Sequence, residues 1–148
     1  MKARDPDFER RVRESFERQA AMATIGASLV RVVPGEVEVA LPFRADLTQQ
    51  HGFLHAGIIT SVLDTAGGYA ALTLMEPGAA VLSVEFKVNL LSPARADEFR
   101  AIGRVVRAGK TVTVVSAEFR GSQGAENTVV AIMTGTMMAV RDRPELAD

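Results

Sequence analysis

The chain has 148 residues, of which 47% are hydrophobic and 24% are charged, and its formal net charge is −1. This length predicts one domain, and the small net charge provides no overall field that would attract nucleic acid or an anionic membrane. The absence of cysteine excludes disulfides, thiolate metal ligands and a cysteine nucleophile. It also fits a cytoplasmic location.

Residues 6–21 are expected to form an amphipathic helix, with Asp5 or Asp7 as its cap. Three apolar residues recur at every fourth position and predict one buried stripe: Phe8, Val12 and Phe16. The remaining positions carry charges of both signs, which indicates a solvated surface and not a signal peptide.

A hairpin is predicted next, because the stretches SLVRVV and EVEVAL flank the turn signal Pro34-Gly35. Residues 42–54 have no periodicity and are expected to form a loop. The apolar run from Ala56 to Met75 approaches membrane-spanning length. We interpret it as a core helix, because Asp64 lies at its centre and glycines interrupt it.

Strands are predicted for the rest of the chain. In VLSVEFKVNLL, residues 81–91, strict alternation places Leu82, Val84, Phe86, Val88 and Leu90 on one face and Ser83, Glu85, Lys87 and Asn89 on the other. Two further strands are expected at about 97–107 and 111–120. The run TVVAIMTGTMMAV, residues 128–140, is apolar on both faces and predicts an interior strand. The polar tail 141–148 is expected to be frayed.

This order of elements predicts an α+β fold, with one long apolar helix covered by an antiparallel sheet. A single helix can cover so long a sheet only if the sheet curves around it. The edges of such a sheet are expected to be open to a partner subunit.

Asp64 is the first candidate for chemistry. Its neighbours within one helical turn offer no positive charge, and an unpaired buried carboxylate costs several kcal/mol or becomes protonated. Carboxylates in such environments concentrate at functional sites. An isolated Asp can also serve a structural role, and the sequence leaves both readings open.

The start of the same helix is the second candidate. At Ala56 and Gly57, free backbone N–H groups and the positive end of the helix dipole could stabilise an oxyanion. An ordinary helix start without a ligand is equally compatible with the sequence. Eight residues separate Ala56 from Asp64, which is about 12 Å along a helix axis. The two could therefore meet only between antiparallel helices of two chains, which predicts an obligate dimer with two composite sites.

Three segments resemble the PaaI-type hotdog-fold acyl-CoA thioesterases: QQHGFLHAGIITSVLDTAGG, SVEFKVNLLSPA and RAGKTV. The resemblance covers roughly residues 25–140. It implies a hotdog fold, in which five or six antiparallel strands wrap a long helix, and a single domain over residues 1–148. It also implies homodimers, often paired into tetramers, that hydrolyse acyl-CoA thioesters.

The resemblance further implies roles for individual residues. Asp64 matches the catalytic carboxylate, which acts as general base or nucleophile, and Ala56 matches the first glycine of the family's His-Gly-Gly, whose N–H polarises the thioester carbonyl. His55 matches the histidine that orients this region, and Gln49 matches an amide that contacts the thioester or water. Ser83 matches a serine that positions water in some members, although alternation places it opposite the apolar row.

Basic residues between 95 and 110 provide candidates for the phosphates of CoA, and we expect Arg107 and Lys110 to meet the nucleotide. The same residues could equally be solvated strand ends. No cofactor is expected beyond the CoA of the substrate, and a metal site is not expected, because His51 and His55 are the only histidines.

Two other functions stay open at this stage. The first is a hotdog hydratase or dehydratase that would use His55. The second is an acyl-CoA-binding module without catalysis; a DNA-reading regulator is not expected, because few residues precede the first strand and they are not basic. The acyl group is left undetermined. Tyr69 and Phe53 could line an acyl tunnel or belong to the core.

Overall fold

The computed structural model describes residues 1–146, so residues 147 and 148 of the tail predicted to be frayed lie outside the described part. A short N-terminal pair of helices precedes a hairpin, a long helix and four more strands. The elements are α1 (Phe8–Glu17), α2 (Ala20–Ile25), β1 (Ser28–Val33), β2 (Glu36–Pro42), the 3-10 helix η1 (Ala45–Leu47), α3 (Ala56–Leu72), β3 (Ala80–Leu90), β4 (Glu98–Ala108), β5 (Val112–Gln123), β6 (Glu126–Val140) and the 3-10 helix η2 (Pro144–Leu146).

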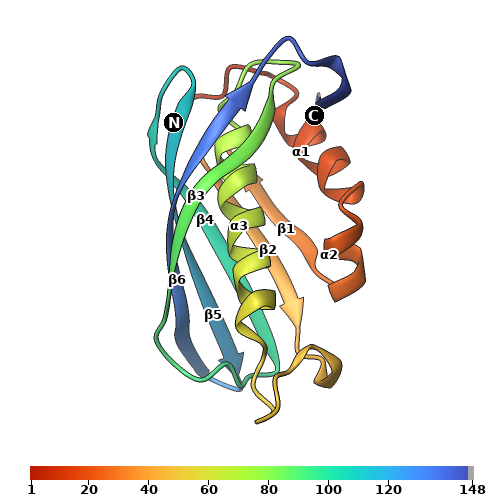
Figure 1. The fold of residues 1–148 in the computed structure, drawn as a ribbon, viewed down its shortest axis with the longest axis vertical. Helices are drawn as coiled ribbons and strands as arrows, with labels where there is room; N and C mark the ends of the chain where they lie inside the picture. Colours follow the sequence, from red (N-terminus) through yellow and green to blue (C-terminus); the bar gives the residue numbers. More distant parts are fainter. Residues whose placement is uncertain (147–148) are drawn as a thin grey trace.

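The strands form one six-stranded sheet in the order β1-β2-β4-β5-β6-β3, and each neighbouring pair is antiparallel. Figure 1 shows this sheet curving around α3, with α1 and α2 beside α3 and β1. The predicted α+β architecture of a long helix wrapped by a curved antiparallel sheet is confirmed. β6 lies between β5 and β3, which confirms the interior strand.

α3 packs directly against the sheet. A Cβ atom on Gly103 of β4 would lie 2.2 Å from the carbonyl oxygen of Ala66, so only glycine permits this approach. Beneath the helix, the rings of Phe99 and Phe119 stack with centroids 5.2 Å apart. Within the described chain, no helix, α3 included, reaches the length and hydrophobicity needed to cross a bilayer.

The N-terminal helix differs from the prediction of one helix over 6–21. α1 ends at Glu17, because Gln19 adopts an extended backbone (φ −75°, ψ 92°), and α2 then begins in a new direction. The predicted apolar stripe is confirmed, since Val12 and Phe16 are buried. Asp7 occupies the cap position but makes no side-chain capping bond.

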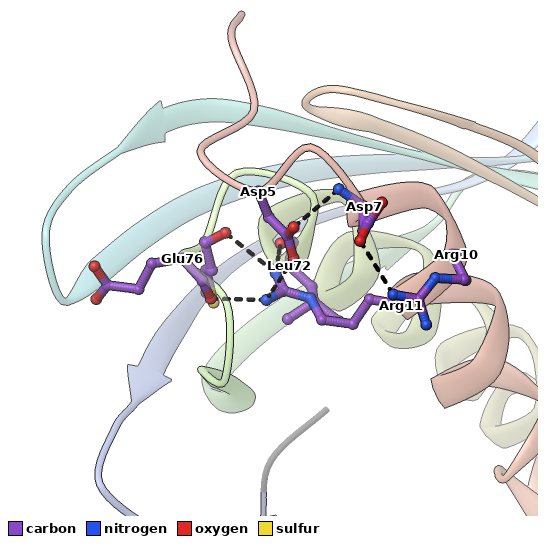
Figure 2. A network of polar contacts seen from close by, with 7 residues as sticks. Asp5, Asp7, Arg10, Arg11, Leu72 and Glu76 are labelled. Atoms are coloured by element: carbon purple, nitrogen blue, oxygen red, sulfur yellow. Dashed lines mark hydrogen bonds and ion pairs between the residues drawn. The ribbon is translucent and has the colours of Figure 1, made fainter.

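A buried ion pair joins the N-terminus to the end of α3 (Figure 2). The guanidinium of Arg11 lies 3.1 Å from the carboxylate of Asp5, and both side chains are more than 90% buried. Arg11 also donates hydrogen bonds to the carbonyl oxygens of Leu72, Met75 and Glu76, at 3.0, 3.1 and 2.7 Å. The three carbonyls lie at and just beyond the end of α3, where backbone acceptors outnumber helical donors. Arg11 therefore adds hydrogen bonds there and fixes α1 alongside α3.

The register of β3 corrects the prediction of strict alternation. Ser83 pairs with Met137 and Glu85 pairs with Thr136, so Val84 is an extra residue in a β-bulge. Consecutive residues of β6 point to opposite faces, and a bulge reverses the alternation of the strand that contains it. Ser83 therefore faces α3, on the side opposite to Glu85.

The tail is partly ordered, contrary to the prediction that it frays from residue 141. Arg141 donates hydrogen bonds to the carboxylate of Glu76 and to the carbonyl oxygen of Lys110. The chain then forms η2. Charge pairing therefore holds Arg141, the first residue of the tail, to the end of the sheet nearest the C-terminus of α3. The polar composition of the tail did not reveal this contact.

Candidate functional site

Asp64 lies in the middle of α3 and is half-buried. Its Oδ1 atom accepts a hydrogen bond of 2.6 Å from the hydroxyl of Ser83. Among residues 1–146, no arginine or lysine forms an ion pair with Asp64. The carboxylate thus has a neutral partner from β3, which corrects the expectation of a fully buried, unpartnered group.

A pocket of about 400 Å³ opens beside Asp64. α3 contributes Asp64 and Gly68, and β3 contributes Ser83. The third wall comes from α1 and the residues after it, which include Arg18 and Gln19. No local sequence signal predicts this wall, because the helix break that turns Gln19 toward α3 has neither a glycine nor a proline at its position.

The first turn of α3 leaves one backbone donor unused. His55 is the N-cap, and its Nδ1 atom accepts a 2.9 Å hydrogen bond from the N–H of Gly57. The carbonyl oxygen of His55 accepts from the N–H groups of Ile58 and Ile59. Within residues 1–146 the exposed N–H of Ala56 has no hydrogen-bond partner. His55 therefore organises the helix start so that Ala56 presents a free donor.

Ala56 and Gln49 line a second pocket, of about 240 Å³. Phe53 and Leu90 contribute apolar surface to it. The loop is held by hydrogen bonds from the N–H of Gln49 to the carbonyl oxygen of Phe53, at 2.9 Å, and from the N–H of His51 to the carboxamide oxygen of Gln49. Phe53 lines this pocket, and whether an acyl group occupies it stays a prediction. Tyr69 is 4% exposed, belongs to the core and also borders the Asp64 pocket.

The predicted site residues therefore form two separate groups. Asp64 and Ser83 lie together, and Gln49, His55 and Ala56 gather at the start of α3. The pocket that Asp64 lines contains no residue of the second group. Eight residues of helix separate the groups, or about 12 Å along the axis, so one chain does not bring a carboxylate and an oxyanion donor to the same reacting atom.

A third pocket, of about 310 Å³, is bordered by His55 and Asp46. The side-chain hydrogen bond from Arg44 lowers the pKa of Asp46 below its ordinary value, which keeps this carboxylate charged. Across residues 1–146, no three His, Asp or Glu side chains are grouped in a way that could hold a metal ion.

The two residues expected to meet the nucleotide lie away from both groups. Arg107 pairs with Val114, which pairs with Thr136, so its side chain lies on the face of the sheet opposite to α3. Lys110 is in the β4–β5 turn, where its carbonyl oxygen accepts from Arg141. Neither lines the Asp64 pocket.

β3 is an edge strand whose second edge has no partner strand within residues 1–146. It nevertheless exposes large apolar side chains on this edge: Leu82 (44%), Val84 (58%), Phe86 (41%) and Leu90 (54%). Edge strands of monomeric proteins are normally protected by charge, proline or brevity. This strand is long and apolar, which is typical of an interface.

A curved antiparallel sheet wrapped around one long helix (Figure 1) defines the hotdog fold. The sequence profile of the thioesterase superfamily matches residues 51–128, more than half of the chain. The chain belongs to this superfamily. Membership supports thioester hydrolysis as its general activity. The resemblance predicted from the sequence is confirmed.

Comparisons with individual proteins agree with this family and fold. A thioesterase family protein from Silicibacter pomeroyi superimposes with a TM-score of 0.89 at 50% identity, covering 90% of this chain and 98% of that one. A predicted esterase of Saccharolobus solfataricus is 36% identical over 68% of this chain and 71% of its own. Human acyl-coenzyme A thioesterase 13 is 30% identical over 70% and 71%. The PaaI protein of E. coli shares the fold, with a TM-score of 0.82 at 22% identity over 90% and 94%.

Proposed function

We propose that this protein hydrolyses an acyl-CoA thioester to the free acid and CoA, at sites shared between two copies of the chain. The observation that carries the proposal is Asp64: a half-buried carboxylate at a pocket, oriented by Ser83 and without a direct ion pair among residues 1–146. The similarity to human acyl-coenzyme A thioesterase 13 supports CoA as the thiol.

Asp64 acts on the thioester carbonyl carbon in one of two ways. As a general base it takes a proton from water while the water oxygen attacks the carbon, and the C–S bond then breaks to release CoA. As a nucleophile it attacks directly, CoA leaves, and water hydrolyses the resulting anhydride. In both routes the hydrogen bond from Ser83 occupies Oδ1 and leaves Oδ2 for the reaction.

The second subunit supplies the electrophilic half of the site. The free N–H of Ala56, at the positive end of α3, donates to the oxygen that becomes negative when the carbonyl is attacked. His55 holds the helix start in this conformation through its bond to Gly57. Gln49 lines the same pocket as Ala56, where its carboxamide contacts the thioester or the attacking water.

A dimer formed along the open edge of β3 would cover the apolar side chains exposed there. With its two-fold axis perpendicular to β3 and α3, the two copies of α3 would run antiparallel. Two such dimers would pair into a tetramer. Arg107 and Lys110 contact the phosphates of CoA in this proposal; Lys110→Glu is expected to raise KM for acyl-CoA, and an unchanged KM would remove Lys110 from it.

A panel of acyl-CoA thioesters tests the function, with released thiol followed by a chromogenic disulfide. The protein has no cysteine and adds no background. Hydrolysis should fall at least about a hundredfold in Asp64→Asn. Binding without turnover would favour a binding module, and hydration of an enoyl-CoA would favour a hydratase. Recovery of ¹⁸O from labelled water in the Asp64 carboxylate after a single turnover would identify the nucleophilic route.

A further inference from the structure

Two adjacent glycines of α3 have different surroundings. A Cβ atom on Gly67 would lie 3.0 Å from the Cε of Met133 and 3.1 Å from the Cγ2 of Val115, so a side chain at this position would press against the sheet. A Cβ atom on Gly68 would meet no atom within 4 Å, although Gly68 is buried. Packing within the chain therefore does not require glycine at position 68. Its missing side chain instead adds space to the pocket beside Asp64.

The position of Gly68 relates this space to the reaction centre. Residues four apart on a helix are neighbours on one face, so Gly68 lies one turn beyond Asp64 toward the C-terminus of α3. A thioester whose carbonyl carbon is within reach of Asp64 can extend its acyl group over Gly68. The opposite wall is formed by the N-terminal segment that contains Gln19.

This opposite wall is polar. Gln19 is half-buried, and its Oε1 atom accepts a 3.4 Å hydrogen bond from the hydroxyl of Thr65. Within the described residues, the carboxamide nitrogen of Gln19 has no hydrogen-bond partner. Covering such a donor with hydrocarbon leaves it unsatisfied and costs free energy. A plain alkyl chain is therefore a poor occupant of this wall, and a group with an acceptor oxygen is a good one.

We propose that the pocket between α1 and α3 holds the acyl group, that Gly68 sets its maximum size, and that Gln19 selects acyl groups carrying a remote oxygen. The substrate class is thioesters whose acyl chain bears a hydroxyl, keto or carboxylate group several bonds from the thioester. This assignment rests on the proposed acyl-CoA hydrolysis and names the substrate of that same site.

The test compares kcat/KM for acetyl-CoA, hexanoyl-CoA and 6-hydroxyhexanoyl-CoA. The wild-type enzyme should prefer the hydroxylated chain to hexanoyl-CoA by about tenfold, since one hydrogen bond is worth up to about that factor. Gln19→Leu should abolish this preference and leave acetyl-CoA hydrolysis unchanged. Gly68→Leu should lower kcat/KM for both six-carbon substrates at least about tenfold and spare acetyl-CoA, because pockets discriminate single methylenes by about 10–200-fold.

Gly68→Ala and Gly67→Ala serve as matched controls for folding. Gly68→Ala should fold with an unchanged or higher Tm and show a smaller loss on six-carbon substrates. Gly67→Ala should lower Tm through its contacts with the sheet and keep the wild-type ratio among the three substrates. Unaltered ratios in both Gly68 variants and in Gln19→Leu would overturn the acyl-pocket assignment while leaving acyl-CoA hydrolysis standing. A wild-type protein that hydrolyses no acyl-CoA would overturn both.

Discussion

Substituting Ala56 by proline removes the proposed oxyanion donor with little effect on the fold. Proline is favoured at the first position of a helix, where its missing N–H has no intrahelical role. The N–H of Ala56 has no partner within residues 1–146, and His55 has the extended backbone (φ −64°, ψ 137°) that a residue before proline prefers. We therefore expect Tm to stay within about 2 °C of wild type, which corresponds to less than about 1 kcal/mol for a domain of this size.

Catalysis should respond very differently. Loss of one oxyanion-hole donor costs about 2.7–4 kcal/mol of transition-state stabilisation, or about a 10²–10³-fold decrease in kcat. Thiol release from acyl-CoA by Ala56→Pro is expected to fall in that range, with a smaller change in KM. Ala56→Ser, which retains the N–H, is the control and should keep most of the activity.

Subunit mixing tests whether the site is composite. Ala56→Pro and Asp64→Asn chains with different affinity tags are co-expressed, and dimers carrying both tags are purified. In a composite arrangement such a dimer has one site with both groups intact and one with neither, so it should show about half of the wild-type activity. If each site lay within one chain, every chain of the mixed dimer would lack either the Ala56 N–H or the Asp64 carboxylate, and no site would be complete. Heterodimers no more active than either parent would refute the shared site.

Three further changes probe the supports of the site. Ser83→Ala should lower kcat about 10–100-fold, because a hydrogen bond to a charged group such as Asp64 contributes about 1.5–3 kcal/mol; Ser83→Thr should restore most of it if the hydroxyl is what matters. His55→Ala should cost about 1 kcal/mol of stability in urea unfolding, and equal losses in His55→Asn, which can still cap, would contradict the capping role. Arg11→Met should cost about 3–5 kcal/mol by leaving Asp5 uncompensated, and Asp5→Asn in the same chain should recover part of that loss.

The sequence predicted the parts of the fold that depend on local periodicity. The hairpin at Gly35, the long apolar helix and the four later strands follow from alternation and turn residues, and each agrees with the structure. The bulge at Val84 could not be predicted in this way. It lies in an uninterrupted alternating run without glycine, and only pairing with β6 determines where the extra residue falls. That single residue decides whether Ser83 reaches Asp64.

Long-range contacts account for the other differences. Gln19, next to the helix break, contacts Thr65, and Arg141 is anchored by Glu76; both partners lie far away in the sequence. Local sequence patterns do not identify contacts between residues that are far apart in the chain. The pocket wall that α1 contributes could therefore not be predicted. Asp64, by contrast, could be recognised, because a carboxylate in an apolar helix is conspicuous wherever its partners come from.

The uncovered side of α3 argues for a second subunit on physical grounds. The exposed face of a surface helix normally carries charged residues, yet Asp64 is the only charged residue among the 17 of α3. The exposed positions of α3 are Ala56, Gly57 and Ser61, all small and uncharged. Small uncharged residues at these positions are weakly hydrated compared with charged ones, and they allow another backbone to approach closely. We infer that a partner covers this face, which is also where Ala56 must lie to meet the partner's carboxylate.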